Sequence, residues 1–367
     1  MIIMSKYNPL WKWINKNKTD DFKLTYAEIE NIAGVPIDHS FLTFKKELLQ
    51  YGFRVAKISM KEQTVTFEKQ ERQNNMELVS DYMHDDTLHH ALNELTRKTF
   101  CFDFESWVMG GYFEGDYIPY SFMENGKIIS NVSANRMTFL QNGVEKHYIQ
   151  IGTVMTDENY RKQGLAKKLI EHVIKQYENE CDGFYLFANL SAVDFYDKCG
   201  FSKEMEYRYA VKEEFCGKKP TGEIFMPVNT ADEQMKQKYM NMVRCSASNS
   251  SLEQLNKFGL QMFYTADMEN VYYAKDLDCF IVAEMEEDTL LLQSIICENK
   301  VLLSDVLSRI GGKYHKCRLG FTPVQEDMHM CIAERYDGSD DYRLFYRGQE
   351  MESIEREKLY FPELSHA

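Results

Sequence analysis

The stretch that most constrains the fold is YRKQGLAKKL, residues 160–169, because it joins a predicted strand to a predicted helix. The residues before it, IQIGTVM at 149–155, read as a strand, and apolar residues recur at helical spacing after Gly164. A glycine lets a ligand approach the backbone, and the first N–H groups of a helix have no partner inside it. With Arg161 beside them, these donors are suited to an anion such as a pyrophosphate.

The segments around this junction predict a mixed α/β domain. Residues 85–100 have the apolar spacing of a helix, and residues 116–155 read as three strands with turns at 124–126 and 141–143. After the helix that starts at Gly164, GFYLFAN at 183–189 is a nearly continuous apolar strand, which is typical of a central position. In the next predicted helix, Ser191 and Asp194 form a capping box.

Two motifs make the chain resemble a known family. They are V-M-T-x-x-x-Y-R-x-x-G-x-A at 154–166 and A-N-x-x-A-x-x-F-Y-x-x-x-G-F at 188–201. In this order and spacing they resemble the GNAT superfamily of acyl-CoA-dependent N-acyltransferases, over residues 76–211. The resemblance implies the GNAT fold, a mixed central sheet flanked by helices. With its second half, the chain resembles the enhanced-intracellular-survival type, without the third domain of that type.

The resemblance also implies acetyl-CoA as co-substrate and assigns residues to it. The backbone of Val154 and Met155 would pair with the pantetheine amides, and Asn189 would hydrogen-bond the pantetheine arm. The pyrophosphate would be held by six consecutive residues: Arg161, Lys162, Gln163, Gly164, Leu165 and Ala166. No metal is predicted, because His89 and His90 lack a third ligand at metal-binding spacing.

Catalytic roles follow from the same resemblance. Tyr196 matches the tyrosine that protonates the departing thiolate, and a phenol with a pKa near 10 is still protonated at pH 7. A backbone N–H near Met155 would polarise the thioester carbonyl. The base stays open between Glu145 or His147, acting through water, and the terminal carboxylate of Ala367.

Residues 212–367 are predicted to form a degenerate GNAT-like domain. Helices are expected at 231–243, 251–258 and 301–310, with strands in the segments at 270–276, 278–286, 288–297, 316–324, 328–335 and 341–348. No R-x-x-G-x-A motif occurs here, since Asn299 to Ser304 contain no glycine at the helix start.

Residues 1–72 are predicted to be a separate small α+β domain. Leu10, Trp11 and Ile14 have helical spacing after Pro9, and Thr25 with Glu28 forms a capping box in a second helix that Gly34 ends. Two strands follow, at 53–59 and 64–69, and residues 68–77 read as a polar linker. The segment resembles a small bacterial domain of unassigned function.

Charge and cysteine content bear on partners and location. The formal net charge is -14, but residues 1–75 hold 12 Lys or Arg against 9 Asp or Glu. This slight excess argues against nucleic acid, and the absence of a long apolar run argues against a membrane. Nine scattered cysteines without a C-x-x-C pair indicate a reducing, cytoplasmic location.

The leading functional prediction is N-acetyl transfer from acetyl-CoA to a primary amine by direct attack in a ternary complex. The acidic balance of the rest of the chain favours a cationic small-molecule or peptide amine as acceptor. The alternative is a non-catalytic acyl-CoA-binding sensor with an N-terminal interaction domain. The sequence leaves open whether the protein is a homo-oligomer.

Overall fold

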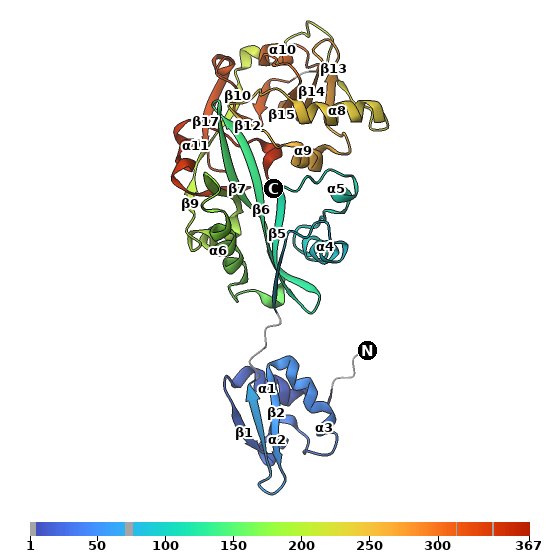
Figure 1. The fold of residues 1–367 in the computed structure, drawn as a ribbon, viewed down its shortest axis with the longest axis vertical. Helices are drawn as coiled ribbons and strands as arrows, with labels where there is room; N and C mark the ends of the chain where they lie inside the picture. The colour runs from blue at the N-terminus through green and yellow to red at the C-terminus, as the bar shows by residue number, and fades with distance from the viewer. Residues whose placement is uncertain (1–4, 70–75, 313, 340) are drawn as a thin grey trace. The chain divides into compact units, whose positions relative to one another are not determined.

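The computed structural model describes residues 5–69, 76–312, 314–339 and 341–367 and divides into two compact units, Met1–Met76 and Glu77–Ala367 (Figure 1). Most of the predicted linker, residues 70–75, lies outside the described residues. Within the described part of the chain, no helix is both long and apolar enough to cross a membrane.

The N-terminal unit combines helices with a three-stranded antiparallel sheet in the order β1-β3-β2. The predicted capping box is confirmed: Thr25 Oγ1 accepts from the Glu28 N–H at 3.2 Å, and Glu28 accepts from the Thr25 N–H at 2.7 Å. Gly34 ends that helix at φ 74°. The elements are α1 (Asn8–Asn17), β1 (Phe22–Thr25), α2 (Tyr26–Ala33), α3 (Phe41–Phe44), the 3-10 segment η1 (Lys45–Tyr51), β2 (Phe53–Ser59) and β3 (Thr64–Lys69).

The first sheet of the larger unit has the order β4-β5-β6-β7-β8-β18-β9, with β12 paired to β6. Both predicted turns are confirmed, since Asn125 and Gly126, like Asn142 and Gly143, have the positive φ angles of tight hairpins. Among the described strands of this sheet, only the β7–β8 pair is parallel. The strands are β4 (Glu77–Ser80), β5 (Tyr117–Glu124), β6 (Lys127–Gln141), β7 (Val144–Thr156), β8 (Gly183–Asn189), β9 (Ser202–Glu204), β12 (Leu252–Gln254) and β18 (Tyr342–Arg347).

Helices cover this sheet, and α6 (Leu165–Tyr177) connects its two parallel strands. Leu169, Ile170 and Val173 of α6 are fully buried against Ile149 and Leu186 of the sheet, which confirms the predicted apolar stripe. The Ser191–Asp194 capping box is wrong: α7 (Val193–Asp197) begins after Ala192 without a side-chain cap, because Ser191 lies in a preceding 3-10 turn. The remaining helices of this half are α4 (Asp86–Phe100) and α5 (Glu105–Met109).

The second sheet has the order β11-β13-β14-β15-β16-β10-β17 and repeats the plan of the first, with one parallel pair among its described strands, β15–β16. Its strands are β10 (Glu206–Val211), β11 (Met226–Pro227), β13 (Val271–Ala274), β14 (Cys279–Glu286), β15 (Thr289–Cys297), β16 (Lys316–Leu319) and β17 (Cys331–Tyr336). Helices α8 (Glu233–Cys245), α9 (Phe258–Thr265) and α10 (Leu303–Leu307) belong to this half, while Ile354 of α11 (Ser353–Arg356) packs against Tyr148 and Tyr185 of the first sheet.

One predicted helix in this half is wrong. Residues 251–258 have apolar residues at helical spacing, yet 252–254 form strand β12, because this segment pairs with the end of β6, Leu252 opposite Gln141. The predicted helix at 301–310 is shorter than expected, since α10 begins at Leu303 and ends at Leu307.

Two strands are exchanged between the sheets. β10, which ends at Val211, lies between β16 and β17 in the second sheet, and β18 lies between β8 and β9 in the first. The domain boundary after Val211 therefore stays a prediction. β10, from the half before this boundary, belongs to the second sheet, and β18, from the half after it, belongs to the first.

Glu206 of β10 connects this exchange to the C-terminal segment. Its carboxyl, 1% exposed, accepts a hydrogen bond from the Phe361 N–H at 3.0 Å and another from the Tyr342 hydroxyl at 3.1 Å. Phe361 in turn stacks on Tyr185 of β8, with ring centroids 4.3 Å apart. Burial raises the pKa of Glu206 to about 8.

This contact predicts a pH-dependent stability. The folded chain binds the Glu206 proton more tightly than the unfolded chain, so stability falls as the pH rises from about 4.5 to about 8. Glu206→Gln keeps an acceptor oxygen for Phe361 and removes the charge. We expect it to gain on the order of 2 kcal/mol in unfolding free energy at pH 8.5 and to lose this pH dependence.

Urea unfolding at pH 5 and pH 8.5 measures both effects, and Glu334→Gln, at an exposed position on β17, is the control. An unchanged pH dependence in Glu206→Gln would contradict the assignment.

Candidate functional site

The centre of the candidate site is a gap between the two parallel strands of the first sheet. β7 and β8 pair only at Tyr148–Gly183, Ile149–Phe184 and Gln150–Tyr185. Beyond these positions β7 continues to Thr156 and β8 to Asn189, and no further pairing joins them among the described residues. The backbone of the second half of β7 thus has free hydrogen-bonding groups on this side, which are suited to an extended ligand.

A bulge in β7 orients these groups. The β6–β7 register shifts between Asn131 and Ser133, opposite Thr153, which has φ 45°; the Thr153 carbonyl accepts from Asn131 Nδ2 at 2.9 Å. The Met155 carbonyl accepts from Ser130 Oγ at 2.9 Å, so it points to β6. Because main-chain groups alternate along a strand, those of Val154 point to the gap. The geometry favours the Val154 N–H over that of Met155 as the donor to a ligand.

The predicted anion cradle lies directly after β7. Lys162 and Gly164 both have positive φ, 63° and 76°, so the chain turns sharply before α6 begins at Leu165. Leu165 is buried and fixes the helix start, Ala166 is half-buried, and residues 161–164 are exposed. Arg161 and Lys162 form no ion pair with any described residue. Free helix N–H groups and unpaired cations together are suited to phosphate.

Tyr196 lies on the face of the sheet that α6 covers. It is 7% exposed and packs against Phe195 and Phe345, with ring centroids 5.1 and 5.9 Å away. Val154 packs against the same apolar cluster. Burial raises the pKa of the Tyr196 phenol, so it remains protonated at neutral pH. Asn189 lies at the exposed end of β8.

The C-terminal residues lie on the opposite face. The Ala367 N–H donates to Gln150 Oε1 at 3.0 Å, and the His366 ring stacks on Phe187 with centroids 3.6 Å apart. The Tyr264 hydroxyl donates to the His366 carbonyl at 2.6 Å. Burial lowers the pKa of His366 to about 3, so the stacked ring is neutral at pH 7. The structure therefore brings Ala367 to the edge of the β7–β8 gap.

Sequence reasoning missed a buried polar cluster beside Ala367. Tyr117 Oη, Asn135 Oδ1 and Gln150 Nε2 are buried without a hydrogen-bond partner among the described residues. Buried groups of this kind are normally paired, so their convergence indicates a place for a ligand or water. The missed signal was the polar series Asn131, Ser133 and Asn135 at alternate positions of β6, which is buried in the sheet.

Two candidate bases are not brought to the gap. Glu145 and His147 lie at the start of β7 with more than half of each side chain exposed, and they contact each other at 3.3 Å. His147 is eight residues from Met155, about 26 Å along a strand. The structure therefore separates both residues from the predicted CoA-binding positions.

A cavity of about 510 Å³ adjoins the loop before the cradle. Its charged lining comprises Glu94, Lys98, Glu124, Lys127 and Asp157, and Tyr160 also lines it and donates to Glu124. Lys98 lies 3.7 Å from Asp157. A volume in this range accepts a small organic ligand, and the carboxylates outnumber the lysines.

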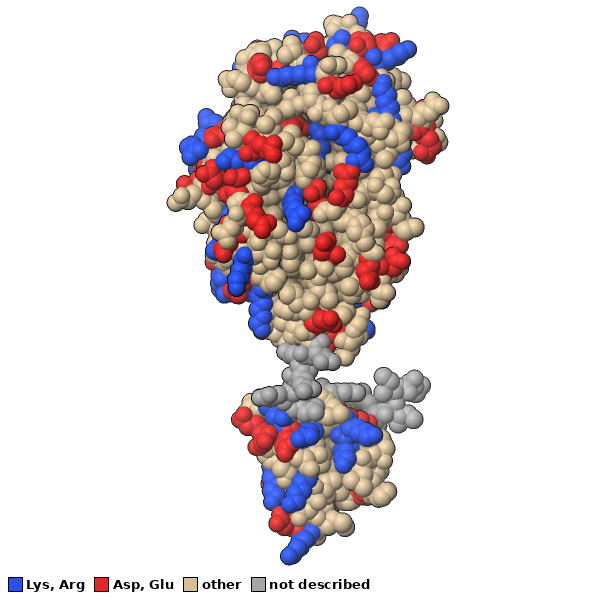
Figure 2. Space-filling view, in the orientation of Figure 1, with Lys and Arg blue, Asp and Glu red and all other residues tan. Residues whose placement is uncertain are grey.

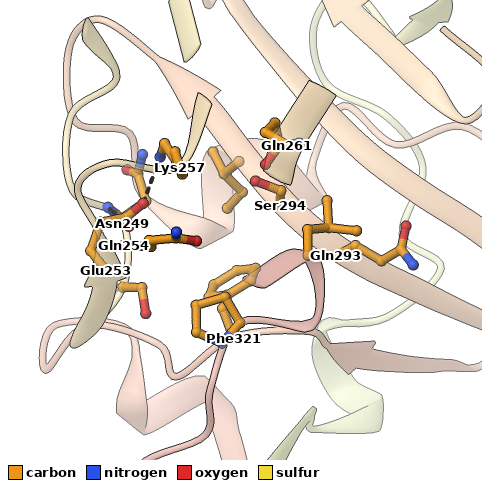
Figure 3. A pocket seen from close by; sticks show the side chains of 12 residues that line it. Asn249, Glu253, Gln254, Lys257, Gln261, Gln293, Ser294 and Phe321 are labelled. Atoms are coloured by element: carbon orange, nitrogen blue, oxygen red, sulfur yellow. Dashed lines mark hydrogen bonds and ion pairs between the residues drawn. The ribbon is translucent and has the colours of Figure 1, made fainter. Parts of the chain in front are cut away.

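A second cavity lies behind the C-terminal segment and is lined by Pro362 and Leu364 (Figure 3). Its volume of about 30 Å³ has room for water but not for a substrate. Lys257 and Glu253 form a largely buried ion pair at its wall, 2.6 Å apart. We interpret the residues that line this cavity as a structural support for the C-terminal segment.

The two adjacent histidines meet a carboxylate that sequence reasoning did not include. Atoms of His89, His90 and Glu105 lie within 4.8 Å of one another. The Asn93 amide contacts both His89 Nε2, at 3.2 Å, and Glu105, at 3.1 Å. Asn93 thereby holds this cluster together at the start of α5.

One family model matches part of the chain. Residues 78–201 match the model of the acetyltransferase (GNAT) family. No curated protein sequence matches the chain.

Solved structures with similar folds include a probable N-acyltransferase from Enterococcus faecalis V583, at 14% identity and a TM-score of 0.49, covering 75% of this chain and 73% of that one. Eis1 from Mycobacterium abscessus is 10% identical with a TM-score of 0.46, covering 73% of each chain. An aminoglycoside acetyltransferase from an uncultured soil sample is 20% identical with a TM-score of 0.30, covering 35% of this chain and 88% of that one. At these scores none of the three supports an argument about function.

The packing at Gly152 predicts how the C-terminal segment can be displaced. A Cβ on Gly152 would lie 2.7 Å from the Ala367 oxygen and 2.7 Å from Asn135 Nδ2. We expect Gly152→Ala to push Ala367 away and to speed hydrogen–deuterium exchange in residues 359–367 at least severalfold, with little change elsewhere. Gly311→Ala, whose Cβ would meet its nearest atom at 3.7 Å, is the control. Unchanged exchange in Gly152→Ala would show that the contact does not hold the segment.

Proposed function

We propose that this chain, whose residues 78–201 match the model of the acetyltransferase (GNAT) family, transfers an acetyl group from acetyl-CoA to a primary amine in a ternary complex. The observation that carries the proposal is the β7–β8 gap, which opens next to the anion cradle at the start of α6. An extended, phosphate-bearing acyl carrier fits both features.

The described residues supply a complementary surface for CoA. The free main-chain groups of Val154 and its neighbours on β7 would pair with the pantetheine amides, and Asn189 would bind the same arm from β8. The pyrophosphate would lie against the backbone of residues 163–166, with Arg161 and Lys162 as cations that form no ion pair with a described residue. When bound, acetyl-CoA supplies the acetyl group as a thioester.

The reaction needs a donor to the thioester oxygen and two proton transfers. The Val154 N–H is the proposed oxyanion donor in place of Met155, because its main-chain groups point to the gap. Tyr196, kept protonated by burial, would give its proton to the departing thiolate. The terminal carboxylate of Ala367, positioned by Gln150, is the proposed base that accepts the proton of the amine.

A cationic amine is the proposed acceptor class. The carboxylates Glu94, Glu124 and Asp157 of the larger cavity outnumber its lysines, and the larger unit as a whole is acidic.

The test is acetyl-CoA-dependent thiol release with a panel of aminoglycosides, polyamines and lysine-containing peptides, beside calorimetric CoA binding. We expect CoA binding together with thiol release for one acceptor class. CoA binding without turnover on any acceptor would favour the alternative of a non-catalytic acyl-CoA sensor. Absence of CoA binding would overturn the assignment of the cradle.

Tyr196→Phe tests the proposed acid. We expect kcat to fall by about 10²- to 10⁴-fold while the Kd for CoA stays within twofold, because only the hydroxyl is removed. Phe195→Leu, at the half-buried neighbour, is the control for packing. If Tyr196→Phe retains full kcat, another group protonates the thiolate.

A further inference from the structure

The N-terminal unit has the element order of a helix-turn-helix followed by a β-hairpin. α2 and the helical segment 41–51, formed by α3 and η1, precede the β2–β3 hairpin, whose turn spans residues 60–63. The sheet order β1-β3-β2 is that of a winged helix. Since a fold alone does not assign a function, the exposed side chains must decide what this unit binds.

The segment 41–51 presents one face to the core and one outward. Phe41 and Leu48 are fully buried. Leu42, Lys46 and Leu49, at helical spacing, are exposed, the two leucines by 45% and 48%. No other element of the described unit covers this face. A helix face that presents apolar and basic side chains together suits a DNA major groove, in which apolar groups contact thymine methyl groups.

Charge is concentrated on the same part of the unit. Residues 5–39 hold five Lys and five Asp or Glu, whereas residues 40–63 hold five Lys or Arg and two Glu. Both glutamates are engaged: Glu47 accepts from Trp11 Nε1 at 3.1 Å, and Glu62 pairs with Lys23 at 3.0 Å. Figure 2 shows both basic and acidic side chains on the visible face of this unit. The net charge of residues 1–75 taken together does not reveal this difference between residues 5–39 and residues 40–63.

Four lysines on the helical segment and the hairpin are available to bind DNA phosphates. Lys45 and Lys46 lie on η1, and Lys57 and Lys61 lie on β2 and its turn. None of the four forms an ion pair with a described residue.

We propose that the N-terminal unit binds double-stranded DNA, with the segment 41–51 in the major groove and the β2–β3 turn against the phosphate backbone. The proposal is independent of acyl transfer, because its surface shares no residue with the candidate site. It replaces the expectation, drawn from net charge alone, that nucleic acid is not a partner.

The test uses the full chain and a fluorescein-labelled 30-base-pair duplex of mixed sequence, measured by fluorescence anisotropy between 50 and 200 mM NaCl. The variant is Lys45→Gln, Lys46→Gln, Lys57→Gln and Lys61→Gln combined. The matched control replaces Lys12, Lys16, Lys18 and Lys69 by Gln, four lysines of the same unit that also lack an ion pair with described residues. Circular dichroism verifies that both variants fold.

We expect the wild-type chain to bind with a Kd of about 10⁻⁴ M or tighter, weakening as salt rises. The variant should bind at least tenfold more weakly, and its log–log salt slope should be shallower by about 0.9 for each lysine that contacts phosphate. An equal loss in the control variant, no binding by the wild type at 50 mM NaCl, or equal binding to a 30-nucleotide single strand would overturn the proposal. If this surface binds a protein and not DNA, the wild-type chain should not bind the duplex at 50 mM NaCl.

Discussion

The exchange of β10 and β18 is the constraint on which the larger unit depends. Each strand completes a sheet formed mostly by the other half of the chain, so neither sheet is whole without residues distant in sequence. Glu206 connects the exchange to the C-terminal segment through the Phe361 N–H. The contact is made by a carboxyl that burial keeps protonated at neutral pH, so the segment is held by a hydrogen bond rather than by an ion pair.

This arrangement determines how the candidate site is assembled. Residues from β7 and β8 line the gap, and residues 361–367 close one face of it. The other face carries Tyr196 and α6. The two proposed proton-transfer groups therefore belong to segments about 170 residues apart. Their relative position depends on the sheet between them, and that sheet depends on β18.

Much of the fold is local and could be predicted. The Thr25–Glu28 capping box, the two Asn-Gly turns and the apolar stripe of α6 each follow from a few neighbouring residues. The predictions that are wrong or missing concern contacts between segments that lie far apart in the sequence. Residues 251–258 have helical spacing but form β12, because pairing with β6 outweighs local propensity. The residue patterns of β10 and β18 do not indicate that the two strands are exchanged between the sheets.

The candidate site divides in the same way. The cradle could be predicted because a glycine, its flanking cations and a helix start are adjacent in sequence. The polar atoms of Tyr117, Asn135 and Gln150 that lack a partner among the described residues could not be predicted, because they come from three strands and converge only in the folded sheet. The orientation of the Val154 backbone depends on the bulge opposite Asn131 and Ser133, and the sequence had no signal for that bulge.

The strand exchange also has a consequence for synthesis on the ribosome. About 150 residues separate the end of β8 from the start of β18, which takes roughly 8 to 30 s at about 5–20 residues per second. Throughout that interval the edge of β8 that β18 will cover has no native partner, and an open apolar strand edge is a template for association with other chains. Nascent chains of this protein should therefore depend on holding chaperones more than a chain with two sequentially folded domains would.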